Sequence, residues 1–334
     1  MTRFLYHPLR IGSVNLEGNL FLAPVAGYTD RAFRSVCVEA GANLTCTELI
    51  SAEGLVRDSK KTAQMLLRAP NERCYVVQLF GSDPDTMGRA VAFLEPYHPE
   101  MVDINCGCPV PKVVKSGAGA ALLRDPDRLA KVVESVVQAS QKYLGGVPVT
   151  IKIRSGWDEA SINYPLVAQR ALEAGAAAIA LHARTRAQGY AGKAQWEHIA
   201  HLVSLVNIPV VGSGDLFTPE DGKQMLEQTG CAAIMFARGA MGNPFIFTET
   251  RQLLEKGYYD PVPVEQRLQW ALRQLELRAL DVGEDIACRE MRKQFCAYSK
   301  GMPGASHLRN AFVQAKTIEE YRQIASQAFP HMHF

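Results

Sequence analysis

Two cysteines separated by a single glycine stand in the stretch DINCGCP, at Cys106 and Cys108. Thiols in this arrangement could bind a metal, attack a substrate as a nucleophile or donate a proton. The pair lacks the further ligands of a zinc site, so we expect no metal, and no Cys/His motif of a hydrolase type accompanies it. Because a thiol near its ordinary pKa is protonated at neutral pH, Cys108 is best suited to act as an acid.

Lys152 is a second candidate, because it stands within the otherwise apolar run VTIKIRSG. A buried ammonium group is unfavourable unless an anion or an electron-rich ring meets it, so we expect Lys152 to face a ligand. Two alternatives stay open. The side chain could point outward from a short strand, or it could form an internal ion pair with Glu48.

The elements that must position these residues recur along the chain as short apolar runs, each followed by a helical pattern. Caps such as Asp30, Asp125 and Thr218 open several helical segments. No GxGxxG follows the first run, as an open doubly wound sheet would normally require, so this α/β pattern predicts a closed (β/α)8 TIM barrel. The eight predicted strands cover residues 20–27, 43–50, 74–81, 101–109, 149–156, 177–184, 208–215 and 232–240.

Polar residues close the predicted strands, and in such a barrel the strand ends converge on one mouth. The last two ends, GSGD and ARGA, offer backbone N–H groups, and Arg238 adds charge where barrels commonly hold a phosphate, so a phosphorylated cofactor is implied. Gln78 could contact a heterocycle or cap its strand, and His182 could be a ligand or a core histidine. The converging set comprises Ala26, Gly27, Glu48, Gln78, Asn105, Cys108, Lys152, Arg154, His182, Arg184, Ser213, Gly214, Asp215, Arg238 and Gly239.

From about Pro244 helical patterns follow one another without strands, which predicts a barrel over residues 1–243 and a helical domain over residues 244–334. The chain is nearly neutral, at +2, so a polyanion must meet a local patch. Between Arg289 and Lys316 six basic residues face the single acid Glu290, which indicates either a phosphate-binding surface or a solvated helix face. The six are Arg289, Arg292, Lys293, Lys300, Arg309 and Lys316.

Two further patterns concern the loop after Cys108 and the cellular setting. The small residues of KSGAGAALL, which include Gly117 and Gly119, predict a mobile loop. Eight cysteines without paired spacing favour reduced thiols in the cytoplasm. The N-terminal stretch has no export-signal pattern, and no run of 18 apolar residues predicts a membrane span.

Several motifs, in order along most of the chain, resemble the tRNA-dihydrouridine synthases, particularly the bacterial B-type group. They are LAPVAGYTDRAFR, TELIS, VQLFGSDP, DINCGCPVPKVVKSGAGAALLRDP, VTIKIRSGWD, LHARTRAQGY, PVVGSGDLF and REMRKQF. The resemblance implies an FMN barrel with an RNA-binding helical domain. It also implies reduction of the C5=C6 bond of tRNA uridine, with NADPH as the electron source.

The resemblance also implies roles for individual residues. Hydride passes from flavin N5 to uracil C6, and Cys108 donates the proton to C5. Contacts to FMN are expected from Pro24, Val25, Ala26, Gln78, Lys152, His182, Ser213, Gly214, Asp215, Ala237 and Arg238. Contacts to the target base or the RNA are expected from Asn105, Arg154, Arg184, Lys112, Lys115, Arg289, Arg292 and Lys293. We expect tRNA as the partner, no required protein partner and a monomer.

Three departures from the family pattern bear on these roles. Ser213 replaces the usual Asn of an NGD motif, Ala237 replaces a Gly, and MRKQFCAY lacks the usual His and Trp. None of them removes Cys108. Two alternative functions stay open: an FMN barrel dehydrogenase of the dihydroorotate type acting on a free pyrimidine, and a catalytically inactive RNA-binding relative.

Overall fold

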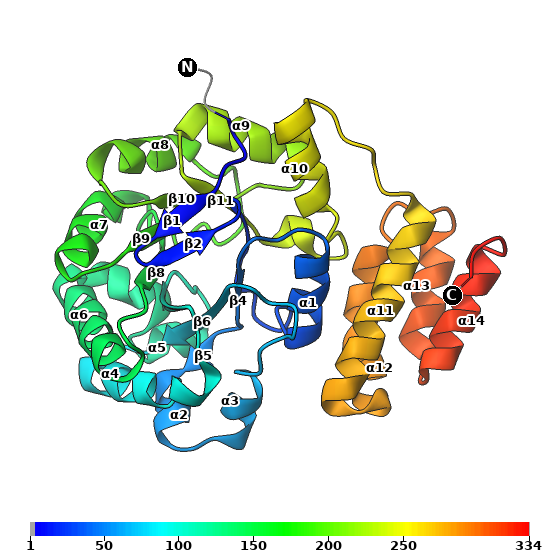
Figure 1. The fold of residues 1–334 in the computed structure, drawn as a ribbon, viewed down its shortest axis with the longest axis horizontal. Coiled ribbons are helices and arrows are strands. Elements are labelled where there is room, and N and C mark those ends of the chain that lie inside the picture. The colour runs from blue at the N-terminus through cyan, green and yellow to red at the C-terminus, as the bar shows by residue number, and fades with distance from the viewer. Residues whose placement is uncertain (1–3, 334) are drawn as a thin grey trace.

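The structure is a computed structural model that describes residues 4–333. A closed ring of eight parallel strands forms its centre (Figure 1). The order around the ring is β3-β11-β10-β9-β8-β7-β6-β4, and a parallel bridge between Phe21 and Leu44 closes it. The predicted (β/α)8 barrel is therefore confirmed, and each predicted strand contains one barrel strand. The strands are β3 (Leu20–Leu22), β4 (Thr45–Cys46), β6 (Tyr75–Phe80), β7 (Met101–Cys106), β8 (Val149–Arg154), β9 (Ala178–His182), β10 (Val210–Ser213) and β11 (Ala233–Phe236). A short extra strand, β5 (Ile50–Ser51), pairs with the end of β6.

Helices surround the ring and follow the strands along the chain (Figure 1). The predicted caps are present: side chains of Asp30, Asp125 and Thr218 accept backbone N–H bonds at the starts of α1, α6 and α9. The helices are α1 (Arg31–Glu39), α2 (Ala52–Val56), α3 (Lys60–Gln64), α4 (Pro84–Ala92), α5 (Pro111–Lys115), α6 (Pro126–Tyr143), α7 (Tyr164–Glu173), α8 (Trp196–Leu205), α9 (Pro219–Thr229) and α10 (Ile246–Lys256). Short 3-10 helices are η1 (Glu95–Tyr97), η2 (Gly119–Arg124), η3 (Glu159–Ser161) and η4 (Arg238–Ala240).

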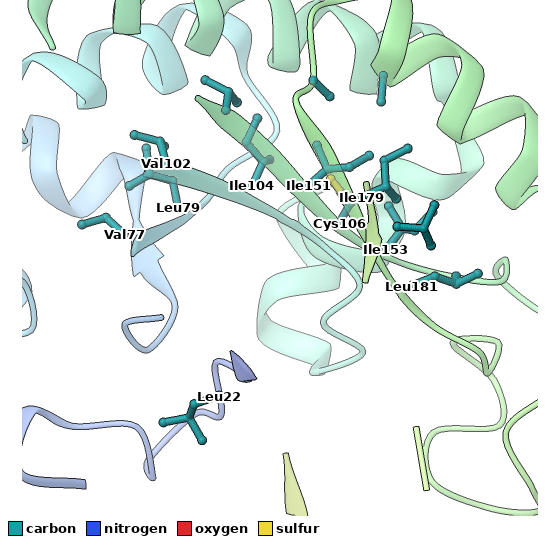
Figure 2. Close-up of a cluster of buried hydrophobic side chains, with 14 of the residues drawn as sticks. Leu22, Val77, Leu79, Val102, Ile104, Cys106, Ile151, Ile153, Ile179 and Leu181 are labelled. Carbon is teal, nitrogen blue, oxygen red and sulfur yellow. The ribbon is translucent and has the colours of Figure 1, made fainter. Parts of the chain in front are cut away.

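Alternate residues of the strands build two apolar layers. Figure 2 shows the outer layer, between strands and helices, with Val102, Ile104 and Ile151 among its members. The inner layer fills the barrel and includes Ile11 and Leu16. These two come from an antiparallel hairpin of β1 (Leu9–Ile11) and β2 (Val14–Leu16), which the sequence patterns did not predict because each strand has only three residues.

A second apolar core lies in the four helices that follow α10, to one side of the barrel (Figure 1). They are α11 (Val264–Val282), α12 (Glu284–Tyr298), α13 (Ala305–Gln314) and α14 (Ile318–Ala328). The predicted boundary after residue 243 falls before α10, yet Ile246 and Phe247 of α10 pack into the barrel core. The prediction placed the boundary where strands end, and β11 is the last strand within residues 4–333. However, α10 is the helix of the eighth βα unit, so the barrel ends one helix later than predicted. Within residues 4–333, no helix is long and apolar enough to cross a membrane.

Candidate active site

A pocket with an empty volume of about 990 Å³ opens at the carboxyl ends of the barrel strands. Most of the predicted cofactor and substrate residues line it, because the strand ends of a parallel barrel share one rim. These are Pro24, Val25, Ala26, Asn105, Cys108, Lys152, Arg154, His182, Ser213, Gly214, Asp215, Ala237 and Arg238. Two predicted residues of the same strand ends, Gln78 and Arg184, do not line it.

The backbone at Cys108 is held by the side-chain amide of Asn105. The Asn105 Oδ1 atom accepts the N–H groups of Cys108 at 2.9 Å and Gly107 at 3.2 Å. The Asn105 Nδ2 atom donates to Gln78 Oε1 at 2.8 Å, and Gln78 Nε2 donates to Asp103 at 2.6 Å. Gln78 is fully buried within this chain of hydrogen bonds. Its observed role is to orient Asn105, and the predicted direct contact with a cofactor has no support in the pocket lining.

The two cysteines of the CxC pair face different surroundings. Cys106 is fully buried in the outer apolar layer, whereas Cys108 lines the pocket and is 9% exposed. Burial raises the pKa of the Cys108 thiol, although the Val110 backbone, Arg154 and Lys152 act in the opposite direction. A raised pKa keeps the thiol protonated at neutral pH, which suits an acid and disfavours a nucleophile.

The segment after Cys108, predicted as a mobile loop, is packed as α5 and η2. Ala118 and Ala120 are fully buried, and the Ala120 N–H donates to the Cys108 carbonyl oxygen at 3.1 Å. Small residues permit this close packing. A Cβ atom at Gly119 would lie only 2.8 Å from the Cys108 oxygen, and Gly119 has a φ of +61°. Gly119 therefore permits a close approach that helps to hold Cys108.

Lys152 lies on β8, two residues before the end of the strand, and it lines the pocket. Neither alternative for this residue is observed: it lines the pocket, and the carboxylate of Glu48 instead accepts the N–H of Gly27. Burial, reinforced by Arg154, lowers the pKa of Lys152 to about 8. An ammonium group with such a depressed pKa gains from a ligand anion, so Lys152 could hold an electron-rich edge of a cofactor.

His182 lies at the end of β9, on the same wall of the pocket. Burial lowers its pKa well below the usual range, and four cations add to the shift: Lys152, Arg154, Arg184 and Arg238. The imidazole is therefore neutral near pH 7. A neutral ring among cations can exchange hydrogen bonds with a ligand without adding charge, and its place in the pocket lining distinguishes it from a core histidine.

The ends of β10 and β11 form the wall suited to a phosphate. Gly214 has a φ of +119°, and a Cβ atom there would lie 3.0 Å from the His182 ring. Ala237 has a φ of −119°, so an alanine fits where the family pattern has Gly. The Ser213 hydroxyl donates to the Met235 carbonyl at 3.1 Å and ties β10 to β11. Backbone N–H groups and Arg238 on this wall could hold a phosphate.

Two exposed aromatic rings flank Arg238 at the pocket rim, and the sequence patterns did not identify them. The Arg238 guanidinium lies 4.5 Å from the Tyr190 ring centre and 5.0 Å from that of Phe217. Both aromatic residues line the pocket. They follow strands β9 and β10 by several residues, so only the rule that loops after strands reach the mouth could have suggested them.

Arg184 was predicted to orient the substrate, and its surroundings correct that prediction. Only 2% of Arg184 is exposed, and its guanidinium donates to both Asp215 oxygens at 2.8 Å and to the Gly192 carbonyl at 2.6 Å. Asp215 also pairs with Arg238 at 3.3 Å. Arg184 therefore holds Asp215 from beneath the pocket floor. Arg154 does line the pocket, although its guanidinium also bonds loop carbonyls, including that of Gly107 at 2.9 Å.

The basic residues predicted to contact RNA differ in their exposure and in their partners. Lys112 and Lys115 are exposed on α5. Arg289 forms an exposed ion pair with Asp285 at 2.9 Å, whereas Arg292 is partly buried.

Lys293 points across the boundary between the helical domain and the barrel. Its ammonium donates to the Gly27 carbonyl and lies 5.0 Å from the Tyr28 ring centre. The N–H of the same Gly27 donates to the Glu48 carboxylate. Gly27 directly follows the pocket residues Pro24 to Ala26, so its backbone is held through both its N–H and its carbonyl group. Nearby, Arg278 of α11 bonds Glu290 at 2.7 Å and lies 3.7 Å from Asp30 of the barrel.

Comparison with known proteins identifies relatives over nearly the whole chain. Residues 21–332 match the family model described as dihydrouridine synthase (Dus). A probable tRNA-dihydrouridine synthase of Treponema pallidum is 50% identical over 98% of this chain and 97% of its own length. The tRNA-dihydrouridine synthase B of Pseudomonas aeruginosa is 37% identical over 91% of this chain and 90% of its own length.

Solved structures show likeness in fold. A variant of NCR from Zymomonas mobilis matches with a TM-score of 0.55 at 16% identity, over 80% of this chain and 96% of that one. Histamine dehydrogenase from a Rhizobium species matches with a TM-score of 0.58 at 14% identity, over 82% of this chain and 51% of that one.

Proposed function

Because the chain belongs to the dihydrouridine synthase family, we propose that it reduces the C5=C6 bond of uridine in tRNA, with FMN as cofactor and NADPH as reductant. The observation that carries this proposal is the position of the Cys108 thiol in the lining of a pocket that also contains Lys152, Arg154 and Arg238. Lys152 and Arg238 give that pocket positive charge at two separate points of its wall.

The donor set of the pocket is compatible with FMN, which has an anionic phosphate and an electron-rich ring edge. Arg238 and the backbone of Gly214 would hold the phosphate, and Lys152 would meet the ring edge with neutral His182 beside it.

When bound, FMN would supply the hydride that uracil C6 receives. The residues of the chain then complete the reduction at C5, where Cys108 delivers its proton and solvent later restores the thiol. Arg154 and Lys152 oppose the rise in the Cys108 pKa, so they would stabilise the transient thiolate. Asn105 fixes the backbone on which the thiol is carried.

A uridine within folded tRNA must leave its stack to reach such a pocket. We propose that α11 to α14 hold the body of the tRNA while the base enters the barrel. Exposed Lys112 and Lys115 on α5 would supply further phosphate contacts beside Cys108.

The deciding experiment uses tRNA from a strain that lacks dihydrouridine. Purified protein loaded with FMN is mixed with NADPH and this tRNA, and dihydrouridine is quantified by mass spectrometry of nucleosides. We expect NADPH-dependent formation of dihydrouridine. Reduction of free orotate or uracil without reduction of tRNA would contradict the proposal, as would a colourless protein that cannot take up FMN.

A further inference from the structure

A second cavity lies at the same end of the barrel, beside the loops that follow β7 and β8. It is open to solvent, with an empty volume of about 690 Å³, and shares no lining residue with the main pocket. Its lining residues are Leu123, Arg124, Trp157, Asp158, Ser161 and Asn163. Asp158 is the single carboxylate in this lining, and it accepts the Ser161 hydroxyl at 2.7 Å within the cap of η3.

Two arginines contact the ring of Trp157: Arg124, which lines the cavity, and Arg186, which lies outside its lining. The guanidinium carbons of Arg124 and Arg186 lie 4.9 and 4.7 Å from its ring. Across residues 4–333 neither guanidinium forms an ion pair or a side-chain hydrogen bond, and Nε of Arg186 is buried without an acceptor. Arg154 and Arg184, nearer the pocket, instead bond carbonyls or Asp215.

Guanidinium groups fixed by an aromatic ring and free of carboxylates retain their N–H donors for an external anion. Their planar, forked geometry matches a phosphate better than an ammonium group would. The chemistry of this cluster therefore favours the phosphates of a nucleotide chain as the ligand.

The position of the cluster decides which nucleotide chain fits. Trp157 follows β8 and Arg186 follows β9, and the two loops are joined by hydrogen bonds from Arg186 N–H to Gly156 O at 2.9 Å and from Ala187 N–H to Trp157 O at 2.8 Å. In the closed ring, β8 is four strands from β3 in either direction. The loop after β3 contacts Lys293 of the helical domain. The cluster thus lies across the mouth from that domain.

We propose that Arg124, Trp157 and Arg186 bind backbone phosphates of the tRNA strand on the side of the target uridine away from the helical domain. This inference rests on the proposed function, since it takes tRNA to be the substrate. An RNA held by the helical domain and entering the mouth would continue over this rim. The guanidinium planes also offer stacking surfaces for an unpaired base.

The test compares two double variants that remove the same charge. Arg124→Ala with Arg186→Ala removes the cluster, and Arg10→Ala with Arg73→Ala removes two exposed arginines ahead of β2 and β6, at the opposite end of the barrel. The dissociation constant for tRNA lacking dihydrouridine is measured by filter binding at several salt concentrations. FMN content and the rate of flavin reduction by NADPH are measured on the same preparations.

We expect the cluster variant to bind tRNA on the order of tenfold more weakly at physiological salt, with a slope of log affinity against log salt less steep by about 1.5. The control variant should match the wild type, and FMN content should be unchanged in both.

Equal tRNA binding by the two variants would overturn the assignment. So would a raised KM for NADPH without a change in tRNA binding, which would place a dinucleotide at the cluster. If the cluster variant binds tRNA more weakly than the wild type as expected, yet the wild type forms no dihydrouridine, only the proposed function would be refuted.

Discussion

The barrel mouth and the helical domain use their charged residues in different ways. At the mouth, side chains from seven or more segments far apart in sequence converge on one pocket. In α12, three basic residues within five positions have different surroundings: Arg289 pairs with Asp285, Arg292 is partly buried, and Lys293 contacts Gly27 of the barrel. Distance along the chain is thus a poor guide to which charges act together.

The convergence at the mouth follows from the geometry of the barrel, and α12 differs from it in its contacts. Parallel strands that end at the same rim bring their last residues together, whatever the length of chain between them. In α12 the three basic residues stand at positions i, i+3 and i+4, which share one side of a helix, so their different partners and not the helical period separate them. Convergence at the mouth is a property of the fold, whereas in α12 the contacts of each side chain set its surroundings.

Removing the thiol at the mouth is the most severe test of this contrast. Cys108→Ala should lower turnover with tRNA by about 10²–10⁴-fold, which is the usual contribution of a general acid. FMN binding and flavin reduction by NADPH should persist, because neither needs the thiol. Stopped-flow absorbance separates the two half-reactions, and dihydrouridine is quantified in the tRNA.

Cys106→Ala is the matched control, since it deletes the same atom two residues away. Cys106 packs in the outer apolar layer, so the variant should lose about 1 kcal/mol of stability and keep most of its turnover. Equal loss of turnover in both variants would mean that the CxC turn acts through its packing, and the acid role of Cys108 would be abandoned.

The sequence predicts the strands and the pocket wall well because both depend on local patterns. Apolar runs and caps at Asp30 and Thr218 mark the elements, and the barrel rule then brings Lys152 and His182 together. What the sequence does not predict is how polar side chains pair within the wall. An arginine at position 184 looks the same in the sequence whether its partner is a substrate or Asp215. Only the tertiary structure shows which partner it has.

Glycines and loop residues were similarly ambiguous. The glycines of KSGAGAALL are compatible with a flexible loop and with close packing, and the contact of Gly119 with the Cys108 carbonyl shows the second. Tyr190 and Phe217 have no spacing signal, because loops after strands vary freely in length. The end of the barrel at α10 required knowledge of which core its apolar face joins.

Asp215 offers the second test, because it organises the floor beneath the phosphate wall. Asp215→Asn removes the charge that pairs with both Arg184 and Arg238. Leaving the buried guanidinium of Arg184 without its counter-charge should lower the free energy of unfolding by about 3 kcal/mol and weaken FMN binding. Thermal unfolding and fluorescence titration with FMN measure the two effects.

An exposed ion pair provides the comparison for Asp215. Asp127→Asn breaks the pair with Arg170, where the aspartate side chain is 77% exposed, so stability should change by less than about 1 kcal/mol. If Asp215→Asn is no more harmful than this control, the network beneath the floor contributes little, and the mouth is no better organised than the surface of the barrel.

The smallest effect concerns Lys293, which distinguishes a joint between the domains from an RNA contact. Lys293→Met should reduce turnover with tRNA by about three- to fivefold, since a partly exposed contact to Gly27 contributes on the order of 1 kcal/mol. Flavin reduction by NADPH should be unaffected. Arg289→Met, which alters an exposed side chain on the same helix, is the control.

If Lys293 sets the position of the helical domain, its effect should persist as salt is raised in the tRNA assay. If it instead binds a tRNA phosphate, the difference from the wild type should shrink steadily with salt, because released counterions drive such contacts. In that case α12 would present a phosphate-binding surface after all, and the contrast with the barrel mouth would be weaker than the contacts of Lys293 indicate.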